Sequence, residues 1–554
     1  MTDDNYWKRI KGSRISRRAF LGGSLATGAA LAAAAAVGCG DDETGTTSTP
    51  RAGGEVKRGG TLSPHTTNDA PHMDLHRTNS IFHASSGAGL AYSRLFRKKI
   101  GQDGLPNRIT PEGDLVERFE NPEPTVFVFH LRRGVKFHNI APVSGRELVA
   151  ADVVQSFERM RAERFNAELI ADVDRMTVVD NYTIRFELKG PNADFLTHLT
   201  DPRAPIMPKE SWEVSGNLER GPIIGSGPWI FQEWQPNQIV RLVRNPDYFR
   251  PGLPYADGLN YFRIADPQTA QAAFRQQQIH TLFQANPQIA RTLSGSVPGA
   301  VLAESRLSNI MGGNKIWTHP DRAPTDNLQF RQAISKVIDR KALIDTVEFG
   351  GGFLSAGIGV PDLSWLLRES EFEELLKVDV ARAKQLAAAA GNPSWSPQFF
   401  AGVRQFPTTS ANAELITAAL KQININATIV LIDNVQLLNN AWGRGEWDIG
   451  FGTQQPQISP TANLEKFYKT GGSQNGYKIS DPELDRMIDR QKTLVDRPDE
   501  RRKLLEDIQR RVIDQAMLIP VYTTIGGVLL QPFLKNYVQD NNENSRFEVA
   551  WLDI

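Results

Sequence analysis

The 554-residue sequence contains a single cysteine, Cys39, and no excess of charge of either sign. One cysteine cannot form an internal disulfide, so a disulfide framework and a cysteine-based zinc site are both excluded. The 63 basic side chains are balanced by 63 acidic ones, which gives a net charge of zero. A nucleic-acid-binding protein usually carries a basic excess on one face, so we expect no nucleic-acid partner.

The sequence also lacks the common motifs of enzymes. It has no His-Glu-x-x-His zinc motif and no Gly-x-x-x-x-Gly-Lys-Ser/Thr phosphate loop. Ser226 lacks the glycines two residues to either side that a nucleophile elbow needs. His72 and His76 follow Pro71 without helical periodicity, which favours a loop over a metal pair. We therefore predict no catalytic residue, metal or cofactor, although a secreted carbohydrate-active enzyme with a pair of catalytic carboxylates stays open.

Apolar residues make up 40% of the chain and charged residues 23%, a composition typical of a soluble globular protein. One hydrophobic core rarely grows beyond about 250–300 residues. The length therefore predicts at least two lobes.

The N-terminal residues have the pattern of an export signal. A basic stretch is followed by the uncharged, Ala-rich run Leu21–Val37, which is shorter than the about 20 residues of a membrane-spanning helix. Such a run suits a signal peptide, which is excluded from the fold. Arg17 and Arg18, within Ser16–Leu21, resemble the twin-arginine signal of proteins exported after folding.

Residues Ala36–Cys39 resemble the lipobox of bacterial lipoproteins, in which the cysteine thiol receives a lipid. The alternative is an ordinary small-residue cleavage site with a bystander cysteine. We predict a signal peptide at 1–38 and a flexible polar tether at 39–58, because this stretch has few apolar side chains to bury. The protein is then extracytoplasmic, in a periplasm or on the outer face of the cell membrane, and anchored through Cys39.

The body alternates strand-like and helix-like segments. Thr125–Leu131 and Tyr182–Leu188 are rich in β-branched and aromatic residues, while Val153, Phe157 and Met160 recur at helical spacing. The second half predicts further elements: a helix capped by Asp379 that ends at Gly391, an apolar helical stripe at Leu415–Ile423, a strand at Ala427–Ile432, a capping box at Ser480–Glu483, a helix through Leu504–Val512 and a strand at Leu518–Tyr522. This alternation predicts α/β lobes.

Two stretches, Phe127–His138 and Ala150–Glu158, resemble the signature of the extracytoplasmic solute-binding proteins of ABC importers, in the dipeptide, oligopeptide and nickel family. The resemblance spans Gly59 to Tyr522, and within the signature Arg132, Phe137 and Asp152 are expected to pack and cap rather than bind ligand. Further matching stretches occur in the family's order: Arg58–Leu62, Pro111–Glu117, Gly225–Trp229, Asn245–Tyr248, Arg331–Ile334, Ile338–Arg340, Pro482–Asp485 and Glu500–Arg501.

The resemblance implies an α/β, two-lobe periplasmic-binding-protein-like fold of the large class, with an extra subdomain and a ligand cleft between the lobes. Lobe I would comprise 59–96, 208–288 and 515–554, the extra subdomain 97–207 and lobe II 289–514. The expected function is capture of a peptide or similar polar solute by lobe closure and its delivery to an ABC transporter permease. A sensory or chaperone-like binding protein without a permease is the alternative.

The identity of the solute depends on where this sequence departs from the family. Its peptide binders resemble each other in a Gly-Trp-x-x-Asp stretch, in which the Asp binds the peptide's amino terminus. Here Trp447 and Asp448 match the preceding pair, but Gln454 and Gln457 occupy the Trp and Asp positions. An amide cannot neutralise a buried ammonium, so a sugar or another non-peptide solute stays open beside a peptide.

Arg404 lies in a loop where family members bind an anionic end, although a solvent-exposed arginine is the alternative. Trp229, Trp317, Trp442 and Tyr477 are aromatic candidates for the cleft, and core packing is the alternative for each. The predicted ligand-binding residues are thus Arg404, Gln454, Gln457, Trp442, Trp229 and Tyr477.

Overall fold

The computed structural model describes residues 55–78, 80–100, 106–283, 287–305, 313–402, 408–432, 447–454, 457–538 and 546–554. Arg17, Arg18, Cys39, Arg404 and Trp442 lie outside these residues, as do the predicted signal peptide and most of the tether. Within the described ranges, none of the helices combines the length and the apolar character needed to cross a bilayer.

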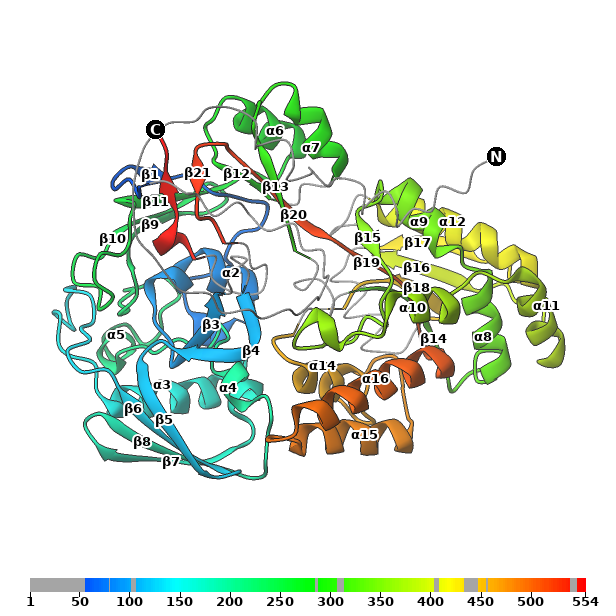
Figure 1. The fold of residues 1–554 in the computed structure, drawn as a ribbon, viewed down its shortest axis with the longest axis horizontal. Coiled ribbons are helices and arrows are strands. Elements are labelled where there is room, and N and C mark those ends of the chain that lie inside the picture. Colours follow the sequence, from blue (N-terminus) through cyan, green and yellow to red (C-terminus); the bar gives the residue numbers. More distant parts are fainter. Residues whose placement is uncertain are drawn as a thin grey trace, which may run out of the picture. The chain divides into compact units, whose positions relative to one another are not determined.

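The first group of sheets combines the N-terminal strands with the C-terminal end of the chain (Figure 1). A five-stranded sheet has the order β1–β11–β10–β9, with β2 also paired to β11, while β20 lies between β12 and β13 and β21 pairs with β22. These strands are β1 (Thr61–Leu62), β2 (His65–Thr66), β9 (Trp229–Gln235), β10 (Ile239–Arg244), β11 (Gly258–Arg263), β12 (Thr281–Phe283), β13 (Val301–Ser305), β20 (Gly526–Leu530), β21 (Leu534–Lys535) and β22 (Trp551–Leu552). Leu62, Leu242 and Val528 share one core, so distant parts of the sequence build this region together.

A four-stranded antiparallel sheet with the order β5–β6–β8–β7 forms a separate layer. Its strands are β5 (Val116–Glu123), β6 (Val126–Leu131), β7 (Val173–Asp180) and β8 (Thr183–Leu188), next to the β3 (Phe96–Ile100) and β4 (Pro106–Gly113) pair. Helix α3 (Ala150–Glu163) packs Val153, Phe157 and Met160 against the rings of Phe129 and Phe186 in one core. The two strands and the helix predicted from periodicity are therefore confirmed.

The third sheet has six strands in the order β15–β19–β14–β18–β16–β17. They are β14 (Asn314–Thr318), β15 (Gly352–Phe353), β16 (Gln398–Gly402), β17 (Thr428–Ile432), β18 (Ile449–Gly452) and β19 (Leu518–Thr524). Strand β16 pairs in parallel with β17 and β18, and the remaining pairs are antiparallel. This mixed sheet confirms the α/β prediction.

Helices accompany each sheet. They are α2 (Ile81–Ser86), α4 (Phe195–His198), α5 (Lys209–Ser215), α6 (Pro267–Arg275), α7 (Pro287–Ser294), α8 (Leu328–Val337), α9 (Arg340–Val347), α10 (Glu369–Leu375), α11 (Val380–Ala389), α12 (Thr409–Leu420), α14 (Pro460–Phe467), α15 (Pro482–Thr493) and α16 (Pro498–Gln515). Helices α8, α9, α11 and α12 share a core with the six-stranded sheet, and α14, α15 and α16 share a second core with Trp317 and Leu518.

The chain passes between the first group of sheets and the six-stranded sheet at two places. Strand β13 pairs with β20, whereas the next strand, β14, lies in the six-stranded sheet. Strand β19 lies beside β14, and β20 follows it after the single residue Ile525 (Figure 1). The two regions are thus joined through β13 to β14 and through β19 to β20.

Two local predictions need correction. The N-terminal cap of α15 is Asp481, whose Oδ1 accepts hydrogen bonds from the N–H groups of Glu483 and Leu484; it is not the Ser480–Glu483 box. Leu415 lies on the outer face of α12 and is 46% exposed, while Ile416 and Leu420 are buried. Asp379 caps α11 as predicted, since its Oδ1 accepts from the N–H of Arg382.

Candidate functional site

Two glycines on β18 make room for an aromatic side chain beside the six-stranded sheet. The indole of Trp317 on β14 lies over Gly450 and Gly452, where added Cβ atoms would approach the ring to 2.6 and 2.8 Å. Trp317 packs at 6.1 Å from the ring of Tyr477 and edge-to-face with Trp447. All three side chains are buried, so the predicted aromatic candidates Trp317 and Tyr477 do lie together.

Gln454 follows β18 and lies beside this aromatic group. Its Oε1 accepts a 3.4 Å hydrogen bond from the hydroxyl of Tyr468, which also contacts the carbonyl of Gly357 at 3.3 Å. Within the described part of the chain, the Nε2 group of Gln454 is buried without a hydrogen-bond partner. Gln457 is also buried, at 1% exposure. The structure therefore brings Gln454 close to Tyr468 in a protected environment.

Lys315, which the sequence analysis did not select, lies two residues before Trp317 and is fully buried. Its ammonium donates a 2.9 Å hydrogen bond to the carbonyl of Gly313. Burial lowers the pKa of Lys315 to about 7. Among the described residues no carboxylate forms an ion pair with it, which is unusual because a buried charge ordinarily needs one.

Gly357 gives the Lys315 side chain its space. Its backbone is left-handed (φ +67°), and an added Cβ would lie 2.6 Å from Cε and 2.7 Å from Nζ of Lys315. The Gly357 N–H donates to Ser355 Oγ, which is itself 2.7 Å from the hydroxyl of Thr523. The glycine is therefore required both by its backbone conformation and by the lysine.

We expect Gly357→Ala to destabilise the protein by about 1–3 kcal/mol, because it adds steric overlap to the left-handed strain. Gly391→Ala is a matched control, since Gly391 has φ +88° but no atom within 4 Å of an added Cβ. The free energies of unfolding from urea titrations should differ by the cost of displacing Lys315. Equal losses in both variants would show that Lys315 adjusts freely.

The remaining predicted residues lie elsewhere. Trp229 begins β9 and is buried among Leu62, Leu242 and Val528, so the structure does not bring it to the Gln454 group. Arg404 and Trp442 fall outside the described residues. His76 is buried within η1 (Leu75–Arg77), and no described residues form a His, Cys, Asp or Glu group suited to a metal ion.

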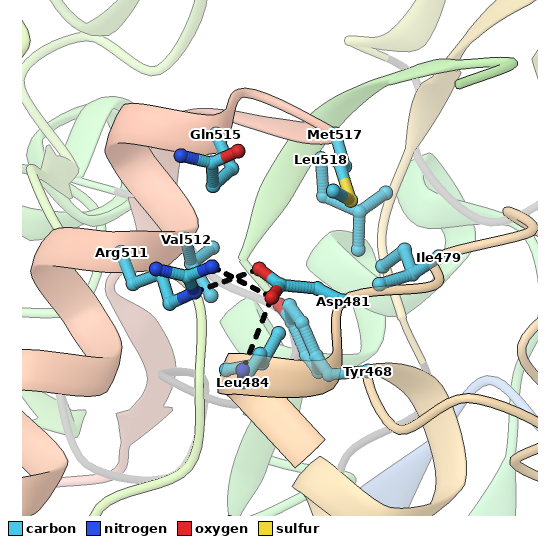
Figure 2. Close-up of a pocket in the computed structure, with 9 residues that line it drawn as sticks. All are labelled: Tyr468, Ile479, Asp481, Leu484, Arg511, Val512, Gln515, Met517 and Leu518. Carbon is cyan, nitrogen blue, oxygen red and sulfur yellow. Dashed lines mark hydrogen bonds and ion pairs between the residues drawn. The ribbon is translucent and has the colours of Figure 1, made fainter. Parts of the chain in front are cut away.

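A small cavity lies behind Tyr468, between the end of α14, α15 and α16 (Figure 2). Its volume is about 10 Å³, comparable to the space that one water molecule needs. Asp481 and Arg511 lie along one side and form a two-point ion pair with both N···O distances at 2.7 Å. This cavity is too small for a solute, and we assign it no binding role.

A second polar cluster, here called the Asp194 contact, joins the α4 region to helices α14, α15 and α16. Asp194 Oδ2 accepts a 2.7 Å hydrogen bond from the guanidinium of Arg501 and a 3.0 Å bond from the N–H of Thr461. Arg501 also donates to Gln491 Oε1. Burial by itself would raise the pKa of Asp194, but Arg501 holds it at about 2, so the carboxylate is ionised.

Two further interactions flank the Asp194 contact. Lys492 on α15 forms a 2.9 Å ion pair with Asp172, and His198 at the end of α4 lies 2.8 Å from the hydroxyl of Ser459. These partners are separated by more than 250 residues in the sequence. Residues 172–198 are thus held against residues 459–501 by charged and polar groups, next to Ile458, which is buried in the same core as Phe195.

The family model for "Bacterial extracellular solute-binding proteins, family 5 Middle" matches residues 110–475, which is more than half of the chain. The chain belongs to family 5 of the bacterial extracellular solute-binding proteins. This match confirms the resemblance drawn from the Phe127–His138 and Ala150–Glu158 signature.

Known relatives of this family 5 protein bind different ligands. Heme-binding protein A of Haemophilus influenzae is 28% identical over 483 residues, covering 81% of this chain and 84% of the relative. The dipeptide-binding protein of Pseudomonas aeruginosa is 25% identical over 457 residues, covering 74% and 82%. The names of these proteins therefore indicate that members of the family bind heme or peptides.

Solved structures of similar proteins share the fold. DppA of Helicobacter pylori, in complex with the peptide STSA, has a TM-score of 0.73 at 22% identity and covers 90% of this chain and 99% of its own. HbpA2 of Haemophilus parasuis has a TM-score of 0.75 at 24% identity, with coverages of 89% and 100%. The family 5 protein therefore has the two-lobe fold of the periplasmic binding proteins.

The signature residues have structural roles. Asp152 accepts hydrogen bonds from the N–H of Val149 and from the guanidinium of Arg146, which fixes the start of α3. Phe137 lies in the core of the four-stranded sheet, and Arg132 donates to the carbonyl of Asp114. The expectation that these residues pack and cap is met in the structure.

Proposed function

We propose that this family 5 protein captures a peptide or similarly sized polar solute outside the cytoplasm and delivers it to the permease of an ABC transporter. Family membership, from a match that covers residues 110–475, carries the proposal. A dipeptide-binding relative and a peptide-bound structural neighbour favour a peptide as the solute. Binding proteins of this type perform no chemistry, so the proposal assigns no catalytic residue.

Capture proceeds, in this proposal, by closure of two lobes over the solute. The pairing of β13 with β20 favours placing β13 in lobe I, and the pairing of β19 with β14 favours placing β19 in lobe II. This proposal differs from the expected bounds, in which lobe II covers 289–514 and lobe I resumes at 515. The extra subdomain, residues 97–207, contains Asp194, whereas Arg501 belongs to lobe II. Polar contacts of this kind are compatible with an interface that opens and closes, because water can solvate both side chains when they separate.

A second candidate is a polar solute without a free amine, such as a sugar. Gln454 and Gln457 are both buried, and neither supplies the carboxylate expected to neutralise a peptide's amino terminus. An amide pair instead offers hydrogen bonds to neutral oxygen and nitrogen atoms.

Native mass spectrometry of purified residues 40–554 tests the function directly. The protein is measured as isolated, then denatured, and the released molecules are identified. We expect a peptide in the released fraction, and protein that has been unfolded, dialysed and refolded is the control that carries no solute. Release of a sugar or another small molecule would keep the binding function and contradict the peptide assignment.

The proposed anchor gives a separate prediction. Cys39→Ser should abolish lipid attachment, because the serine hydroxyl cannot replace the thiol that receives the lipid. We expect the wild type to partition into the detergent phase of Triton X-114 and the variant into the aqueous phase. Aqueous partitioning of both proteins would show that Cys39 is a bystander and that the tether is not lipid-anchored.

A further inference from the structure

The buried ammonium of Lys315 has more hydrogen-bonding capacity than its surroundings use. A lysine has three N–H donors, and in the described part of the chain only the carbonyl of Gly313 accepts from it, at 2.9 Å. The residues opposite it in the sheet, Gly452 on β18 and Pro520 on β19, carry no polar side chain. Two donors of a charged group are therefore left without acceptors.

Arg340 shows how this protein satisfies a buried cation that has a purely structural role. Its guanidinium donates to the carbonyls of Pro520, Leu376, Ser335 and Ile338 and to the hydroxyl of Ser335, at 2.8–3.2 Å. No carboxylate is needed there, because carbonyl oxygens surround the group. Among the described residues Lys315 has only one such bond, so a structural role does not explain it.

Other unsatisfied donors lie around the same backbone segment, residues 357–359. Asn463 uses its Oδ1 to accept from the N–H of Gly359, and its buried Nδ2 has no partner among the described residues. Gln454, which reaches Gly357 through the hydroxyl of Tyr468, likewise has an unpartnered Nε2. The cluster of Lys315, Gln454 and Asn463 thus has a surplus of donors, one of them positively charged, and a shortage of acceptors.

We propose that Lys315, together with the amides of Gln454 and Asn463, binds an anionic group of the captured solute, such as a carboxylate. A carboxylate offers about four acceptor sites and neutralises the ammonium, which meets both needs of the cluster. This anion site rests on the proposed function in one respect, which is that its ligand is the transported solute.

The test compares acids with their neutral amides. The probe is an equimolar mixture of di- to pentapeptides, each present as the free acid and as the C-terminal amide, and the captured fraction is quantified by mass spectrometry. We expect the wild type to enrich the acids at least tenfold and Lys315→Met to lose that enrichment. Lys336→Met is the control, because Lys336 on helix α8 is a partly buried lysine whose amine donates a 3.0 Å hydrogen bond to the carbonyl of Leu375.

Stability separates a binding role from a structural one. Lys315→Met removes an unpaired buried charge, so we expect a higher Tm than the wild type in the absence of solute at pH 7. A structural lysine would give a lower Tm in the same variant. A lower Tm, equal capture of acids and amides by the wild type, or an acid preference that survives in Lys315→Met would each overturn the proposal.

A second experiment separates a protein that binds no peptide from one that has no anion site at Lys315. If no peptide is captured, thermal shifts with acetate, succinate and glutarate are compared with those of their amides. Stabilisation by the carboxylates alone, lost in Lys315→Met, supports an anion site in a protein whose solute is not a peptide. The absence of any carboxylate-specific shift overturns the anion site whatever the solute proves to be.

Discussion

Arg501→Met should weaken binding of the solute recovered from the purified protein by about 100-fold or more. The substitution leaves the buried Asp194 carboxylate without its cation, and removing one partner of a buried ion pair costs about 3–5 kcal/mol. Since a tenfold change in affinity corresponds to about 1.4 kcal/mol, the lower figure already gives about 100-fold. In the proposed open form water solvates Asp194, so the substitution makes lobe closure, and therefore solute binding, less favourable. Isothermal titration calorimetry measures this loss of affinity.

The Tm of the solute-free variant distinguishes closure from ordinary packing. If the Asp194 contact forms only on closure, the Tm of the solute-free protein should change by no more than a few degrees. Arg510→Met on the same helix is the control, because the Arg510–Glu371 pair is only partly buried and therefore contributes much less than a fully buried pair. A large fall in Tm with unchanged affinity would place the Asp194 contact in a permanently packed interface.

The second large effect is a loss of affinity for anionic solutes as the pH rises above 7. The pKa of Lys315 is lowered to about 7 by burial, and a bound carboxylate raises it again. Below pH 7 the ammonium is already present, whereas above pH 7 binding must take up a proton. Each pH unit then costs up to tenfold in affinity, so we expect a decrease of about 10- to 100-fold between pH 7 and pH 9.

The tyrosines near Lys315 do not change their charge in this pH range. Tyr468, which contacts Gly357, and Tyr522 on β19 both have pKa values raised above 10 by burial, so they remain neutral. Glu348, hydrogen-bonded to Tyr522, has its pKa raised by burial. Calorimetry at pH 8 in phosphate and in Tris should report uptake of nearly one proton by the wild type and none by Lys315→Met. A pH-independent affinity would remove Lys315 from the site.

The sequence predicted the fold well where local patterns decide the structure. Alternation in Val126–Leu131 and Thr183–Leu188 and helical spacing in Ala150–Glu163 reflect which side chains must be buried. The cap at Asp379 was also predictable, since a short acceptor before an apolar run satisfies the first helical N–H groups. The N-terminus of α15 was misassigned by one residue because Ser480 and Asp481 are both good caps, and only the structure shows which one bonds.

The Asp194 contact and the role of Lys315 were less predictable, because the residues involved have partners that are distant in the sequence. Asp194 and Arg501 are 307 residues apart, and neither has a pattern that indicates the other. Lys315 was overlooked because a lone lysine in an apolar strand ordinarily extends its amine to solvent. In the strand Asn314–Thr318, however, all five side chains are buried, including that of Lys315.

The fluorescence of Trp317 is expected to respond to the charge of the neighbouring Lys315. Lys315 and Trp317 are two residues apart on β14 and therefore project from the same face of the sheet. Neutralising an ammonium beside a buried indole changes the local electric field, and indole emission shifts in wavelength with that field. The fluorescence of Trp317, read against a Trp317→Phe variant, is thus a label-free signal for arrival of an anion at this strand.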